Sequence, residues 1–274
     1  MRDLADMELE CQPRALGQIS ITADRKRNKT VLCDLYQQGC LKALFPQRDS
    51  HIEAVLVNTA GGITGGDHLQ FTATAEKEAH LVLTTQACER VYRAQGQSTG
   101  KVTTNLTVQD GAMLAWLPQE TIFYDHGRLQ RRLTVNLSKS ARALIVEPVL
   151  FGRLAMGETQ LNGMFQDQIE ILMDGVLSYC DKTLLAGDIT AKLARPAVVN
   201  GMHAMATLIY RAPAASGVAE QIKRLLNPTS GGSLLENDLL VLRLLARNGQ
   251  DLRRMMLPIL DLLTQNTLPK CWRL

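Results

Sequence analysis

The stretch Lys101–Val108, KVTTNLTV, carries the clearest fold signal in the chain, because five of its eight residues are β-branched. Such residues favour an extended backbone, where their stiff side chains pack well on a pleated surface. The next residues, Gln109-Asp-Gly-Ala, form a typical turn sequence. The pattern therefore predicts a strand that ends in a tight turn at Asp110-Gly111.

Further strands are predicted on both sides of this stretch. Arg132–Leu137 and Gln168–Met173 alternate apolar and polar residues, and Asp174-Gly175 gives the second run its turn. His80–Thr85 and Ala143–Val146 are continuous apolar runs, which we expect to be strands buried on both faces. No regular helical pattern lies between these strands, which argues against a doubly wound α/β sheet. We predict a mainly β, stacked-strand scaffold that resembles a β-helix, formed as one domain over residues 1–274 with its β-rich part at 15–212.

The composition changes near Pro213, and a helical segment is predicted over 213–265. One helix is expected from Ser216 to Leu226, and a second from Ser233 to Arg247 with a capping box at its start. The second run is apolar around most of its circumference, which is more than a surface helix needs. It is therefore covered either by its own domain or by another protein. We predict that Leu240 and Leu244 support a partner interface.

Composition and charge exclude several classes of protein. The chain has 274 residues, is 46% hydrophobic and carries a net charge of +3, which is too small to indicate a nucleic-acid partner. The first eleven residues are charged and lack the apolar core of a signal peptide. The apolar tract Met255–Leu263 is interrupted by proline and aspartate, so it predicts no membrane span. We expect a cytoplasmic protein whose six cysteines, none in a C-x-x-C pair, stay reduced thiols.

The segment Asn58–Asp67, NTAGGITGGD, holds four glycines within six residues. The spacing of Gly61 and Gly66 fits a phosphate-binding loop, but Asp67 stands where that loop requires lysine. A carboxylate repels phosphate, so nucleotide binding is excluded. The pairs Gly61-Gly62 and Gly65-Gly66 are interpreted as tight turns between two strands, with Asp67 either capping a free amide or serving a site.

The remaining candidate residues indicate no enzyme class. The five histidines lack metal-ligand spacing, and the chain has no G-x-S-x-G nucleophile motif. A small-molecule enzyme with the glycine-rich loop lining its pocket stays open as an alternative. A metal storage or sensor protein is a weaker one.

Five motifs in order resemble the urease accessory protein D family (UreD, also called UreH). They are NTAGGITGGD at 58–67, TTQACERVYR at 84–93, LPQETIFYD at 117–125 followed by GRL, GRLAMGE at 152–158, and the terminal LPKCW at 268–272. The motif residues carried over from the family are Asn58, Gly61, Gly62, Gly65, Gly66, Gln86, Arg90 and Glu120.

The resemblance implies a non-catalytic maturation factor for urease, a nickel enzyme. Such a protein is a β-rich scaffold that docks on apo-urease and binds a helical accessory partner, UreF, which recruits the GTPase UreG. No tightly bound cofactor is implied, but nickel in transit is. On this interpretation Asp67 lines an internal passage and offers its carboxylate to a hydrated nickel ion; the alternative is that Asp67 only caps its turn.

Overall fold

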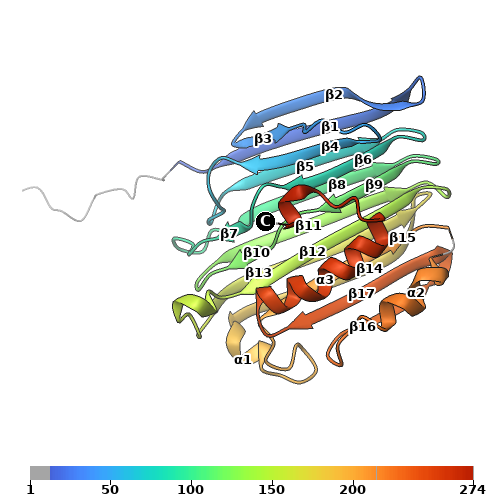
Figure 1. Ribbon diagram of the computed structural model, residues 1–274. Helices are drawn as coiled ribbons and strands as arrows, with labels where there is room; N and C mark the ends of the chain where they lie inside the picture. The colour runs from blue at the N-terminus through green and yellow to red at the C-terminus, as the bar shows by residue number, and fades with distance from the viewer. Residues whose placement is uncertain (1–12, 214, 274) are drawn as a thin grey trace, which may run out of the picture.

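The computed structural model describes residues 13–213 and 215–273, which form two β-sheets packed face to face with helices against one of them (Figure 1). Residues 1–12 lie outside the described residues, and with them the predicted lack of a signal peptide and the thiol of Cys11. Within the described ranges, no helix is both long and apolar enough to cross a membrane.

The first sheet has seven strands and is parallel except at its two edges. In spatial order they are β14 (Val176–Asp188), β13 (Asn162–Met173), β11 (Arg128–Leu137), β8 (Gly100–Val108), β5 (His68–Ala75), β1 (Leu16–Lys26) and β2 (Lys29–Gly39). The predicted strands at 101–108, 132–137 and 168–173 are confirmed. The turn at Asp174-Gly175 is confirmed as well, with both residues at positive φ.

The second sheet has ten strands. In spatial order they are β16 (Gly231–Leu235), β17 (Leu239–Ala246), β15 (Ala204–Arg211), β12 (Arg142–Phe151), β9 (Met113–Leu117), β6 (His80–Thr85), β4 (Ile52–Asn58) and β3 (Leu41–Leu44), with the short β10 (Thr121–Phe123) beside β12 and β7 (Glu89–Val91) beside β10. The central residues of β6 and β12 are buried, which confirms that these runs are covered on both faces.

The chain winds between the sheets as a stack of coils. β4 leads to β5, β6 to β8, β9 to β11 and β12 to β13, so each coil adds one strand to each sheet. Successive strands of one sheet are therefore parallel and in register, as in β5, β8 and β11. A coil buries its apolar face only against its neighbours, which is the logic of a solenoid. The predicted stacked-strand architecture is confirmed.

Two apolar clusters hold these layers together. The larger lies between the sheets and includes Phe123, Phe151 and Phe165, whose rings meet edge to face or tilted. The smaller lies between the outer face of the ten-stranded sheet and the C-terminal helices. Those helices are α2 (Ser216–Lys223) and α3 (Gly249–Thr264), while α1 (Ile189–Leu193) and the short 3-10 helix Leu154–Met156 lie in connections. The predicted helix at 216–226 is confirmed in its first two turns.

The predicted helix at Ser233–Arg247 is wrong. These residues form the hairpin β16–β17, whose turn contains Asn237 and Asp238 at positive φ. The side chains of β17 alternate between the two apolar clusters, so an almost wholly apolar run is what a strand covered on both faces needs. The helix starts later, because the Asn248 side chain accepts from the Asp251 amide and caps α3. The helical segment predicted over 213–265 thus contains two strands.

Candidate functional site

Four long connections meet at one end of the stack, at the left of Figure 1 where β7 and β10 lie. They cover residues 59–67, 86–99, 118–127 and 152–161, and each carries one of the motifs singled out in the sequence. The opposite end has short turns at 76–79, 109–112 and 138–141. Because the strands of successive coils are parallel, their matching ends lie side by side. Motifs far apart in the chain therefore meet at one surface.

The glycine-rich segment is shaped by its neighbours from the next coil. A Cβ on Gly62 would lie 2.3 Å from the Tyr92 ring and 2.7 Å from the Arg90 carbonyl oxygen. A Cβ on Gly65 would lie 2.4 Å from the Ser98 carbonyl oxygen. Glycine is required here because another backbone approaches too closely for any side chain. The interpretation of both glycine pairs as tight turns agrees with this packing.

Asp67 is bound into the same turn. Its side chain is 5% exposed; Oδ1 accepts from the Ala15 amide at 2.8 Å and Oδ2 from the Thr64 amide at 2.7 Å. A carboxylate that accepts two amide hydrogen bonds is a strong structural cap. The geometry supports the capping interpretation, and Asp67 is absent from the lining of the internal cavity. A role of Asp67 toward nickel stays a prediction.

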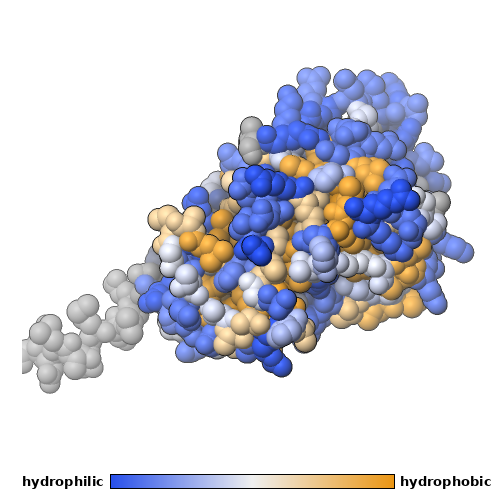
Figure 2. Space-filling view, turned by 60° about the horizontal axis from the view of Figure 1, so that its bottom comes forward, coloured by the Kyte–Doolittle hydropathy of each residue, from blue (hydrophilic) through white to orange (hydrophobic). Residues whose placement is uncertain are grey.

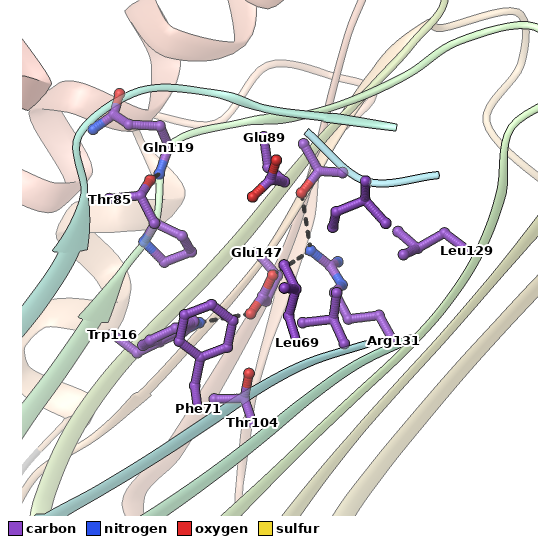
Figure 3. A pocket seen from close by; sticks show the side chains of 14 residues that line it. Leu69, Phe71, Thr85, Glu89, Thr104, Trp116, Gln119, Leu129, Arg131 and Glu147 are labelled. Carbon is purple, nitrogen blue, oxygen red and sulfur yellow. Dashed lines mark hydrogen bonds and ion pairs between the residues drawn. The ribbon is translucent and has the colours of Figure 1, made fainter. Parts of the chain in front are cut away.

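A small cavity with a mostly apolar lining lies between the two sheets, beneath the motif-bearing loops (Figure 3). Its volume is about 60 Å³, enough for a few water molecules. Leu69, Phe71 and Leu129 line it from the seven-stranded sheet. The buried pair Arg131 and Glu147 spans it, with Arg131 on the same strand as Leu129 and Glu147 on β12 of the other sheet. Burying charged groups such as these costs free energy unless they are paired, so their contacts decide what chemistry the cavity offers.

The charged wall is an ion-pair network. Arg131 donates to the Asp167 carboxylate through Nε at 2.9 Å and Nη2 at 2.7 Å, and its Nη1 lies 2.5 Å from Glu147 Oε2. The Trp116 indole donates to Glu147 Oε1 at 2.7 Å. Burial raises the pKa of Glu147, and the Arg131 charge opposes that rise. One guanidinium thus faces two carboxylates in the interior of the stack.

Glu89 connects this cavity with the surface. It lines the internal cavity and also an outer pocket of about 150 Å³, whose walls include Asn58, Gly61, Gln86 and Arg90. The Asn58 amide donates to Glu89 Oε2 at 3.1 Å. Burial raises the pKa of Glu89 to about 7, so its proton is exchangeable near neutral pH. Sequence reasoning missed Glu89. It could have been found from its position between Gln86 and Arg90, which are two predicted site residues.

Glu120 has a different surrounding from these residues. Its carboxylate accepts from the Arg253 guanidinium at 3.0 and 2.8 Å and from the Cys88 thiol at 3.3 Å. Burial, followed by the Glu120 charge, raises the pKa of Cys88 to about 11, which keeps this thiol protonated. Glu120 therefore anchors helix α3 and faces away from the cavity. Over the residues that the structure describes, no three His, Cys, Asp or Glu side chains are grouped as metal ligands.

The predicted interface residues Leu240 and Leu244 are buried, with 3% and 0% of their surface exposed. Both belong to the smaller apolar cluster, beneath the C-terminal helices. A side chain in that position cannot meet a partner directly. The prediction that they contact another protein has to be corrected, because the apolar surface that suggested it is covered within the chain.

Comparison with known proteins relates this site to a family. The model of the family described as UreD urease accessory protein matches residues 15–273. The chain belongs to the UreD family. The urease accessory protein UreD of Roseobacter denitrificans is 45% identical over 263 residues, covering 96% of each chain. The UreD proteins of Ruegeria pomeroyi and Agrobacterium fabrum are 48% and 40% identical, over 89% and 96% of this chain and 95% and 93% of theirs. The resemblance inferred from the five motifs is confirmed.

Membership in the UreD family gives the chain its general role. The family is described as an accessory protein of urease, so the chain has a role in urease maturation. In this UreD chain the motif residues differ in their surroundings, and Gly62 and Gly65 lie where a neighbouring backbone leaves no room for a side chain. Asn58, Gly61, Gln86 and Arg90 line the outer pocket, whereas Glu120 fixes the C-terminal helix.

Proposed function

We propose that this chain is a non-catalytic scaffold that binds apo-urease and a helical accessory protein and lets nickel reach the urease site through its interior. The observation that carries this proposal is the position of Glu89 between an outer pocket and an internal cavity whose wall holds the ion pair of Arg131 and Glu147. The protein would act in the cytoplasm. GTP hydrolysis would belong to UreG, recruited by the helical partner UreF, because the glycine-rich loop at 58–67 carries a carboxylate where a phosphate loop needs lysine.

The chemistry of the cavity suits a cation in transit. The carboxyl groups of Glu89 and Glu147 line the cavity, and the Arg131 guanidinium pairs with Glu147 and with Asp167. A divalent cation would favour the deprotonated form of Glu89, so entry of the ion would release a proton. Oxygen ligands and water bind nickel less tightly than grouped histidines and cysteines would, which favours release at the far end.

The size of the cavity argues against the alternative of a small-molecule enzyme. Ligand sites for metabolites commonly measure about 300–1,000 Å³. The internal cavity is about 60 Å³ and the outer pocket about 150 Å³. Neither could enclose a substrate of ordinary size. The observations therefore favour a conduit over a catalytic pocket.

The helical partner would meet the end of the stack where β14 and β16 are edge strands, the lower end of Figure 1. Seen from this side, apolar residues lie exposed among hydrophilic ones (Figure 2). Exposed apolar side chains on the two edge strands are Val176, Leu177, Leu184, Leu234 and Leu235. A solenoid end needs a polar cap or a partner to stay soluble, and this end has an incomplete cap. We propose that the helical protein binds at this end of the stack and not at Leu240 and Leu244, which are buried.

Nickel loading of urease tests the conduit. Urease matured with Glu89→Gln should contain less nickel and be less active, because the amide is isosteric but cannot supply the charge. Asp67→Asn is the matched comparison: it keeps a capping oxygen outside the cavity lining, and normal activation by this variant would leave Asp67 as a structural cap. Both proteins should fold and bind apo-urease. Full nickel loading by Glu89→Gln would overturn the proposed route.

A further inference from the structure

The loop end of the stack carries a group of arginine and tyrosine side chains around the outer pocket. Arg90 lines that pocket and is exposed, and Tyr92, two residues later, is 37% exposed. The Tyr92 and Tyr124 rings meet edge to face with centroids 5.3 Å apart. The Arg153 guanidinium lies 4.2 Å from the Tyr124 ring centroid, a cation–π contact. These side chains, from three different connections, form one continuous surface.

This surface has an excess of positive charge. Its arginines are Arg90, Arg93, Arg128 and Arg153. Its carboxyl groups are Asp125, 3.5 Å from Arg93, Glu158, which accepts from Arg153 and from two backbone amides, and Glu89 in the pocket wall, which accepts from the Asn58 amide. In the part of the chain that the structure describes, Arg90 has no carboxylate within 4.0 Å, and the Arg128 guanidinium donates to a carbonyl oxygen and a thioether. Arg90 and Arg128 are thus left without a carboxylate among the described residues, and Arg93, whose side chain is 68% exposed, has only its 3.5 Å contact with Asp125 and can also meet an outside partner.

Exposed apolar groups border the same arginines. Leu154 and Met156 follow Arg153 in a short 3-10 helix, with 36% and 77% of their surface exposed. Arginine, tyrosine and methionine are the residues enriched at the centres of protein interfaces. A nucleic-acid site would need a broader positive surface than a chain with a net charge of +3 offers. The mixture of guanidinium, aromatic and thioether groups fits a folded protein surface.

We infer that this surface, defined by Arg90, Tyr92, Arg93, Tyr124 and Arg153, is a docking site for an acidic protein surface, and that apo-urease supplies it. The second part rests on the proposed function: a recipient of nickel has to sit over the pocket through which the ion leaves. Carboxylates of the partner would pair with Arg90 and Arg93, and an apolar group would pack on Tyr92.

The test measures binding of purified apo-urease to the full chain and to the double variant Arg90→Glu/Arg93→Glu. Both side chains are exposed, so the variant should fold. We expect the Kd to rise at least about tenfold, and the salt dependence of binding to become weaker, because fewer charge pairs are screened. The control is Arg254→Glu on helix α3, whose side chain is 70% exposed, and which should bind like the original chain.

Each outcome has a separate meaning. If the original chain binds apo-urease and the double variant binds within twofold, this docking surface is wrong while the proposed function stands. If the original chain does not bind apo-urease at all, the proposed function fails first. Tighter binding of a single-stranded RNA than of apo-urease, lost in the double variant, would show that the arginines serve nucleic acid and would also overturn the inference.

Discussion

Arg253 and Glu120 form a two-pronged ion pair although they are 133 positions apart in the chain, with Nε–Oε1 at 3.0 Å and Nη2–Oε2 at 2.8 Å. The Arg253 guanidinium also lies 5.2 Å from the centroid of the Trp272 ring. The Trp272 indole in turn donates to the Leu117 carbonyl at 3.0 Å. The terminal LPKCW motif and the LPQET motif are therefore joined through helix α3. This contact ties the C-terminal layer to the loop end that carries the outer pocket.

Replacing Arg253 with methionine should destabilise the protein by about 2–4 kcal/mol. The Glu120 side chain is 5% exposed, so the change would leave a buried carboxylate without its cation. Urea denaturation would measure the loss. Arg254→Met, on the same helix but 70% exposed and 3.8 Å from Asp251, should change stability by less than about 0.5 kcal/mol. Equal effects of the two substitutions would show that the ion pair contributes nothing specific.

Gly62→Ala should cost more stability than Gly61→Ala. Gly61 has φ +77° with no atom within 4 Å of an added Cβ, so alanine there costs about 1–2 kcal/mol of backbone strain. Gly62 has φ +155°, and its Cβ would also meet the Tyr92 ring and the Arg90 carbonyl, so its cost should exceed about 3 kcal/mol. Thermal unfolding of both variants would rank them. The reverse order would contradict the packing of the glycine-rich loop on Tyr92.

Leu244→Ala should destabilise the isolated chain by about 2–5 kcal/mol, because Leu244 is fully buried in the smaller apolar cluster. Leu234→Ala, on the adjacent edge strand and 43% exposed, should cost less than about 1 kcal/mol. Chemical denaturation of each chain without partners makes this comparison. In a measurement of binding to the helical partner, Leu234→Ala should have the larger effect of the two, since Leu234 lies at the end proposed to meet that partner. A stable Leu244→Ala chain would mean that this cluster does not support the fold.

Stability of Glu89→Gln relative to the original chain should depend on pH. The folded-state pKa of Glu89 is raised from 4.5 to about 7, so the folded state holds a proton that the unfolded state releases. The protonated Glu89 side chain therefore contributes to the free energy of unfolding below pH about 4.5, and this contribution is lost as the pH rises to about 7. Glutamine has no proton to lose in this range. The free energy of unfolding of the variant should therefore exceed that of the original chain by up to about 3 kcal/mol as the pH rises from 5 to 8. Parallel stability curves would show that Glu89 is an ordinary solvated carboxylate.

Local sequence patterns predicted most of the β stack. Lys101–Val108 and Gln168–Met173 are strands because β-branched or alternating side chains fit a pleated surface, and the Asp-Gly turns end them. The same reasoning failed at 233–247. A run that is apolar on all sides fits a helix or a strand covered on both faces, and only its neighbours decide between them. Here β15 offers a free edge with which β17 pairs.

The motifs of the sequence by themselves determined the family, and the carboxylate in the lysine position of NTAGGITGGD predicts that this loop binds no phosphate. The tertiary structure decided what each residue of those motifs does. Asp67 caps two amides, Glu120 holds Arg253, and Glu89 lies where an outer pocket meets an inner cavity. These roles depend on contacts between coils that are tens of residues apart. Residue type and spacing within one segment do not encode such contacts; they arise when parallel strands bring the ends of successive coils side by side.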